Sequence, residues 1–149
     1  TYRHSHRPMT LVFAKERSEE GIREALQARR TAVYFDDYLV GREPELNAFF
    51  KASLVIKAER STQRNVEPVI RIRIQNNSDI PYEVTCQSDY DFENLPLGRV
   101  TLKPHETTTL TLKRLWQEVQ EVPLRFEVQN VLVSPEKALT SELRVKVSE

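Results

Sequence analysis

The chain has 149 residues, with 22 Lys and Arg against 22 Asp and Glu, so its formal net charge is zero. Its length fits one or two small soluble domains. Because affinity for nucleic acid depends on a basic surface, the charge balance predicts no nucleic-acid partner. The three glycines lie too far apart to form a phosphate-binding loop, which excludes the dinucleotide and P-loop classes. No apolar run approaches the length of a membrane span, so none is expected.

The first fifty residues mix strand and helix signals. Residues 10–14 and 31–35 are short apolar runs of β-prone residues and are predicted to be buried strands. Between them Ser18 can cap a helix that has acidic residues in its first turn and arginines at its end. Strand, helix and strand with short connections form a βαβ unit, which normally sits in a larger parallel sheet or barrel. A second helix is expected over residues 44–52.

From about residue 53 the apolar period changes to two, which is typical of half-buried antiparallel strands. Ile70, Ile72 and Ile74 show this alternation most clearly. Other strands are predicted at residues 54–58, 82–86, 98–102, 107–112, 124–133 and 139–147. Seven or so short strands at this spacing favour an immunoglobulin-like or fibronectin-like sandwich. We therefore expect two domains, residues 1–52 and 53–149.

Two acidic or histidine-containing pairs in the first half are candidate sites. His4 and His6 could present two imidazoles to one metal ion if the segment is extended, although solvated histidines are the more common case. Asp36 and Asp37 could hold a cation or act as a general base at a strand end. A turn that ends the strand is the interpretation we favour for them.

The second half offers further candidates, each with a structural alternative. Asp89 and Asp91 suggest calcium, with an ordinary turn as the favoured interpretation. Cys86, which has no partner cysteine, follows a core-strand pattern and is expected to be a buried thiol rather than a nucleophile. Arg71 and Arg73 could bind an anion, but the polar face of a sandwich is the simpler explanation.

Trp116 and five other aromatic residues could be core or contact residues. Trp116 is as compatible with an interstrand plug as with a contact residue. An aromatic cluster is expected near the join between the halves, as an interdomain core or, less favoured, a ligand pocket; its members are Tyr34, Phe35, Tyr38, Phe49 and Phe50.

Four stretches, residues 6–18, 20–26, 28–31 and 41–43, together resemble the tail of a PHP-domain phosphoesterase. The resemblance is to the subgroup named after a phosphodiesterase that acts on haloalkyl phosphoesters, in which a β-sandwich follows the PHP barrel. It implies an α+β fold: an N-terminal strand-helix-strand remnant of a PHP barrel, followed by an antiparallel immunoglobulin-like β-sandwich.

The resemblance also implies a function. A parent enzyme of this family hydrolyses phosphoesters at divalent metals that its barrel binds through His, Asp and Glu. The family's metal motifs would lie upstream of His6, so we expect this chain to be a non-catalytic C-terminal portion, with no catalytic residue and no cofactor of its own. Arg7 is expected to approach the substrate phosphate in the intact enzyme. The alternative is a metal-dependent hydrolase in its own right that uses His4 and His6.

The expected partners follow from the same resemblance. The main one is the upstream PHP barrel of the parent chain. Strands cut from a barrel need cover for their edge and apolar face, so we also predict a homodimer through residues 10–14 and 31–35. Family analogy implies an exported or periplasmic location.

Overall fold

The structure is a computed structural model that describes residues 7–61, 68–93, 95–113 and 119–148. The described part is mostly β. It has two α-helices, α1 (Glu19–Gln27) and α2 (Glu43–Ser53), and a short 3-10 helix, η1 (Pro96–Gly98). The strands are β1 (Met9–Val12), β2 (Thr31–Phe35), β3 (Tyr38–Gly41), β4 (Leu54–Ser61), β5 (Val69–Asn76), β6 (Tyr82–Gln87), β7 (Asp91–Phe92), β8 (Arg99–Leu102), β9 (Thr107–Lys113), β10 (Glu121–Ser134) and β11 (Lys137–Ser148).

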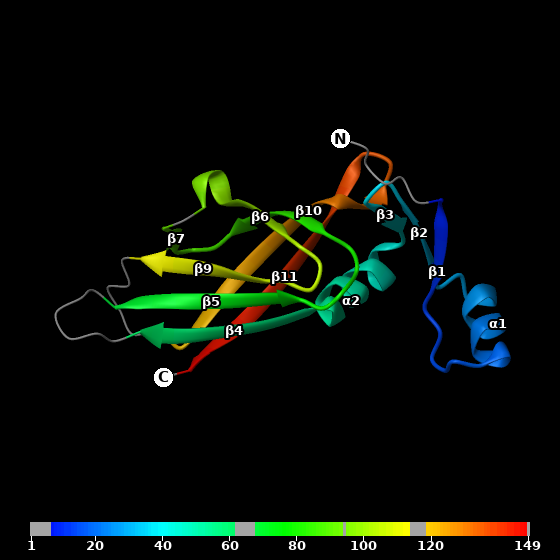
Figure 1. Cartoon of the computed structure of the whole chain (residues 1–149), viewed down its shortest axis with the longest axis horizontal. Helices are drawn as coiled ribbons and strands as arrows, with labels where there is room; N and C mark the ends of the chain where they lie inside the picture. The colour runs from blue at the N-terminus through cyan, green and yellow to red at the C-terminus, as the bar shows by residue number, and fades with distance from the viewer. Residues whose placement is uncertain (1–6, 62–67, 94, 114–118, 149) are drawn as a thin grey trace.

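Most of the strands form a two-layer sandwich (Figure 1). One layer has the order β8, β6, β10, β11 and the other has the order β4, β5, β9, β7, with antiparallel neighbours throughout. A short parallel pairing joins β11 to β4, where Val147 lies opposite Ala58. The predicted immunoglobulin-like sandwich is confirmed.

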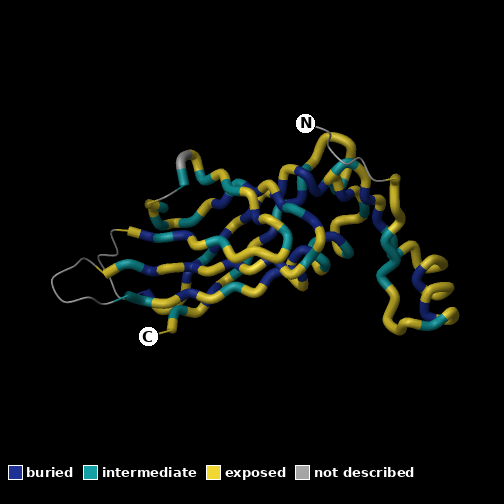
Figure 2. Tube along the Cα trace, in the orientation of Figure 1, coloured by how far each residue is buried: buried dark blue, intermediate teal, exposed yellow. Residues whose placement is uncertain are grey.

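The core lies between the two layers, as the alternating pattern predicts. Ile70, Ile72 and Ile74 of β5 are fully buried, while the residues between them are exposed (Figure 2). Phe126 and Val128 of β10 are likewise fully buried. Burial of one such side chain contributes about 1.5–3 kcal/mol, so this alternation stabilises one register of each strand over a shift by one residue.

The N-terminal segment differs from the prediction. β1 pairs with β2 in antiparallel fashion, β2 pairs with β3, and β3 joins β10 in parallel, with Leu39 opposite Val131. The α+β architecture with a strand-helix-strand remnant of a PHP barrel is therefore wrong. A βαβ unit would require β1 and β2 to run parallel, whereas here the segment extends the sandwich within one mixed sheet of eleven strands.

A two-residue turn explains the hairpin of β2 and β3. Asp36 and Asp37 both have positive φ, 49° and 64°, between the paired residues Phe35 and Tyr38. Positive φ at both central positions defines a type I′ turn, whose twist suits a two-residue antiparallel connection. The interpretation of these aspartates as a turn that ends a strand is confirmed, and the turn also starts the next strand.

α1 is fixed at both ends by its own sequence. The Ser18 side chain accepts a hydrogen bond from the Gly21 amide at 3.0 Å, as expected for a cap. After the helix, the Arg30 guanidinium bonds to both carboxylate oxygens of Glu24 and, through Nε, to the Phe13 carbonyl at 3.1 Å. These bonds hold the end of α1 beside the end of β1, so that β2 starts there and runs antiparallel to β1.

α2 packs across one end of the sandwich, and the predicted helix over residues 44–52 is confirmed. Phe50 is fully buried, with its ring 4.9 Å from that of Tyr82 in an edge arrangement. Ser141 of β11 donates to the Asn47 side chain at 2.7 Å, and the hydroxyls of Ser53 and Tyr82 lie 2.9 Å apart. α2 thus anchors the N-terminal segment to both long strands of the first layer and to β6.

Candidate functional site

The histidine and arginine candidates lie at the start of the chain. His4 and His6 are outside the described residues. Arg7 is exposed, two positions before β1 begins at Met9. The Arg7 side chain therefore faces solvent, and its approach to a substrate phosphate stays a prediction.

The acidic candidates are spread over separate places. Asp37 accepts a hydrogen bond from the Tyr34 hydroxyl at 2.9 Å, and burial and this carboxylate raise the pKa of Tyr34 to about 12. Asp89 lies in a bend before β7, and Asp91 begins that strand opposite Lys113. Among the described residues, no three His, Cys, Asp or Glu side chains gather to hold a metal ion.

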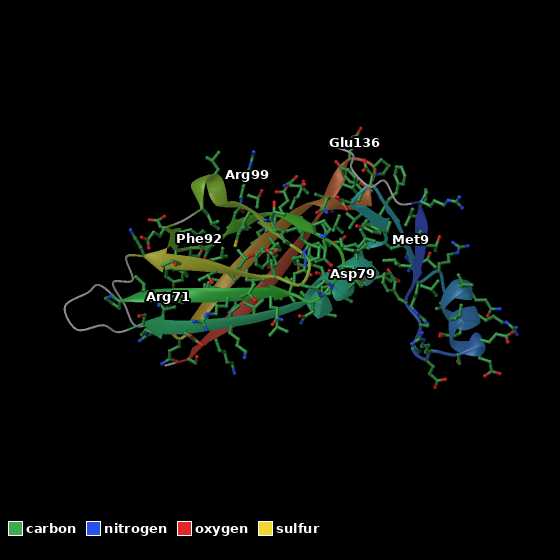
Figure 3. All side chains as sticks on the ribbon, viewed as in Figure 1. Met9, Arg71, Asp79, Phe92, Arg99 and Glu136 are labelled. Atoms are coloured by element: carbon green, nitrogen blue, oxygen red, sulfur yellow. The ribbon has the colours of Figure 1, made fainter. Side chains whose placement is uncertain are left out.

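The remaining polar candidates follow their structural interpretations. Cys86 is 2% exposed, and burial raises the pKa of its thiol to about 12, which suits a core residue and not a nucleophile. Arg71 (Figure 3) and Arg73 lie on the outer face of β5. Arg73 pairs with Glu59 of β4 at 3.5 Å. They belong to the polar face of the sandwich. Trp116 lies outside the described residues.

The five aromatic residues do not form the single cluster that the sequence suggests. Phe50 points into the sandwich core, whereas Phe35 and Tyr38 point outward and are about half exposed. Phe49 instead contacts Phe13, with ring centroids 5.6 Å apart. The hairpin geometry separates them, because alternate residues of β2 face opposite sides of the sheet.

A pocket of about 590 Å³ lies where β1 and β2 meet α2 and the loops of the sandwich. One side is apolar and is formed by Met9, Leu11, Phe13, Tyr34 and Phe49; the other side is polar and is formed by Asn77, Ser78, Asp79 and His105. Asp79 lies near the end of α2 (Figure 3). The mixture of apolar walls and a polar rim could hold a side chain or a small ligand.

The rim carries a histidine and aspartate pair that sequence reasoning did not assemble. Nε2 of His105 lies 2.6 Å from Oδ1 of Asp79, and the two residues are 26 positions apart. The nearby Ser78 hydroxyl donates to Oδ1 of Asn76 at 2.8 Å instead of to the histidine. Ser78 therefore does not form with His105 the hydroxyl contact that an activated serine nucleophile requires. The two residues of the pair belong to separate loops, so no local sequence pattern indicates that they meet.

A second, larger groove of about 930 Å³ lies on the outer face of β8, β6 and β10. Its walls are mainly polar and include Glu83, Thr85, Arg99, Thr101, Glu127 and Gln129. Arg99 marks its position beside η1 (Figure 3). In the sequence this groove is indicated only by the polar alternation of the strands.

The sandwich and its order of strands define an immunoglobulin-like domain. Residues 54–144 match the Ig-like domain family DUF5001, and the chain belongs to that family. No curated protein sequence matches the chain. Among the described residues, no helix is both long and apolar enough to cross a membrane.

One solved structure is similar to nearly the whole chain. It is the crystal structure of a two-domain protein containing a predicted PHP-like metal-dependent phosphoesterase from Bacteroides vulgatus. The two chains are 37% identical with a TM-score of 0.73, and the match covers 94% of this chain and 39% of that chain. This chain therefore spans less than half the length of that relative.

Proposed function

We propose that this chain is the non-catalytic C-terminal portion of a PHP-type metal-dependent phosphoesterase, with its sandwich acting as an accessory or interaction domain. The observation that carries the proposal is the extent of the match to the Bacteroides vulgatus protein. The Ig-like family model begins at residue 54, yet the structural match covers 94% of this chain. The likeness therefore includes the N-terminal segment and not the sandwich alone.

Several finer proposals belong to this function. Residues 1–52 would be the part that contacts the phosphoesterase domain upstream, and residues 53–149 the accessory sandwich. Divalent metals would be bound by the phosphoesterase domain, and Arg7 would lie near the substrate phosphate. The haloalkyl-phosphodiesterase-like subgroup and an exported or periplasmic location are proposed on the sequence resemblance alone.

The alternative function is a metal-dependent phosphoester hydrolase within this chain itself. His4 and His6 would supply two ligands, because alternate residues of an extended segment point to the same side. The remaining ligands would come from carboxylates elsewhere in the chain. This alternative predicts that the 149-residue chain itself binds metal in stoichiometric amount.

The deciding experiment compares the purified 149-residue chain with the two-domain Bacteroides vulgatus protein. Both are supplied with manganese and zinc, and bound metal and hydrolysis of a chromogenic phosphodiester are measured. We expect metal and turnover in the two-domain protein and neither in this chain. Turnover by this chain that the His4→Ala, His6→Ala double variant loses and His105→Ala retains would establish the alternative. An inert, metal-free two-domain protein would contradict the phosphoesterase assignment.

A further inference from the structure

Exposed apolar side chains gather in the N-terminal segment. Among the described residues, nine large apolar side chains are between 41% and 83% exposed, and seven of them lie within residues 9–40. The other two, Val55 and Leu97, lie on the sandwich. Single exposed apolar residues are normal, but a concentration on one segment marks an interaction surface. We define the docking face as Ile22, Leu26, Val33, Phe35, Tyr38 and Val40.

The β2–β3 hairpin contributes four of these residues to one side of the sheet. Val33 lies opposite Val40, and Phe35 lies opposite Tyr38, so the two pairs share a face. The opposite face is formed by Ala32, Tyr34 and Leu39, which are at most 8% exposed. Antiparallel strands with one solvated face normally place polar residues outward. This hairpin instead has apolar residues on both faces, as a hairpin covered on both sides would.

α1 adds further exposed apolar side chains beside β1. Its buried residues are only Gly21 and Ala25, while Ile22 and Leu26 are 44% and 50% exposed. Val12 lies opposite Thr31, which places it on the same side of the sheet as Val33. A pocket of about 360 Å³ is lined by both Val12 and Ile22, so α1 lies beside the end of β1.

The helix carries its apolar residues away from the sandwich. α1 lies at the end of the molecule beyond β1, on the far side from the sandwich (Figure 1). Ion pairs between Glu19 and Arg23 and between Glu24 and Arg30 give it a charged border. An apolar centre with a polar rim is the usual arrangement of a protein interface.

We propose that the docking face binds the phosphoesterase domain of the same polypeptide, so that the β2–β3 hairpin and α1 form the interface and the sandwich projects from it. This inference rests on the proposed function and adds the surface that performs it. The solved relative supports this occupant: its match includes most of the N-terminal segment, whereas only 39% of that chain, a two-domain protein containing a predicted PHP-like phosphoesterase, is covered by the match.

The first test uses the solved two-domain relative. When this chain is superposed on it, the positions equivalent to Phe35 and Val40 should be buried against the unmatched part of that chain. The position equivalent to Val55 should stay exposed and serves as the control. Solvent exposure at the Phe35 and Val40 positions would overturn the proposal.

The second test separates docking from activity. In the two-domain relative, lysine is introduced at the position equivalent to Phe35, and thermal unfolding is followed by calorimetry. We expect the cooperative transition to split or its first midpoint to fall by several degrees, with no such change for lysine at the Val55 equivalent. Unchanged unfolding overturns the docking proposal. Hydrolysis by the wild-type relative is measured separately and tests only the proposed function.

The third test asks whether a second copy of this chain occupies the docking face instead. Sedimentation velocity is measured on the 149-residue chain, on Phe35→Lys and on Val55→Lys, with circular dichroism to confirm folding. The proposal replaces the homodimer through residues 10–14 and 31–35 that the sequence resemblance suggests, so we expect all three to sediment as monomers at micromolar concentration. A wild-type dimer that Phe35→Lys dissociates and Val55→Lys preserves would make the second copy the occupant and overturn our proposal.

Discussion

The side-chain amide of Asn130 donates a hydrogen bond of 2.8 Å to the backbone carbonyl of Asp37, a residue 93 positions earlier in the chain. The same amide group donates to the Pro81 carbonyl at 2.6 Å, and the Asn130 side-chain oxygen accepts from the Glu83 amide at 2.9 Å. Asn130 lies where the register of β10 shifts after Val128. One side chain therefore ties the β2–β3 turn, the start of β6 and β10 together.

Asn130→Ala should lower the free energy of unfolding by about 1–3 kcal/mol, because buried backbone groups lose their partner. Asn130 is only 3% exposed, so water cannot readily replace these bonds. Urea denaturation measures the loss, with the exposed neighbour Gln129→Ala as the matched control. Hydrogen exchange should also become faster in β3. An equal, small effect for both variants would show that the three bonds contribute little.

Tyr34→Phe should flatten the alkaline loss of stability. Folding raises the pKa of Tyr34 from 10.0 to about 12, through burial and the Asp37 contact. The folded state thus holds this proton more tightly, and the stabilisation is complete below pH 10 and is lost as the pH rises toward 12. Urea unfolding at pH 8, 10 and 11 measures it. Tyr38→Phe on the exposed face is the control and should retain the wild-type slope.

Cys86 should resist alkylation in the folded protein. Burial raises the pKa of its thiol to about 12, and access to reagent is blocked as well. At pH 8 we expect reaction with iodoacetamide to be slower than in urea by at least about 10²-fold, since the thiolate is the reactive form. Mass spectrometry of timed samples gives both rates. Comparable rates in the two conditions would mean that β6 opens readily.

Gly98→Ala should destabilise the sandwich by about 1–3 kcal/mol. Gly98 has a φ of 70°, and a Cβ atom there would approach the Cys86 carbonyl oxygen to 2.4 Å. Backbone would have to move to relieve this contact. Thermal unfolding measures the change, and no change would indicate that η1 shifts freely.

The neighbouring substitution Leu97→Gly should act in the opposite direction. Leu97 also has positive φ, 59°, and is 83% exposed, so it has little packing to lose. Glycine adopts this conformation without the steric cost that a side chain adds, about 1 kcal/mol. We expect a small rise in the unfolding midpoint, in contrast to the fall for Gly98→Ala. A fall for both variants would show that the Leu97 side chain contributes packing.

The positions of the strands and helices were easier to predict from the sequence than the way the strands pair. The period of two located β5 and β6 well, because one face of each is buried against the other layer. The prediction that β1 and β2 run parallel was wrong, because the two strands are antiparallel. The sequence around α1 specifies a helix between two strands but not the direction in which the second strand pairs with the first. The parallel pairings of β3 with β10 and of β11 with β4 join distant segments and leave no local signal.

Among the candidate residues, too, local features were predictable from the sequence and long-range contacts were not. The turn at Asp36 and Asp37 is predictable because it directly follows an apolar strand run, and aspartate tolerates the positive φ that both residues adopt. The contact of His105 with Asp79 and the three bonds of Asn130 depend on loops that meet only in the folded chain. An asparagine within a strand pattern gives no indication that it joins three segments.

The parallel bridge between β11 and β4 has a consequence for the order in which the protein can fold during synthesis. Ser148 donates to the Ala58 carbonyl across 90 residues, beside the pair Val147 and Ala58. β4 and β5 can pair early as neighbours along the chain, but the layer that contains β11 cannot close on them until residue 148 has left the ribosome. Until then the apolar inner face of β5 has only part of its cover, which makes the nascent chain a natural substrate for chaperones.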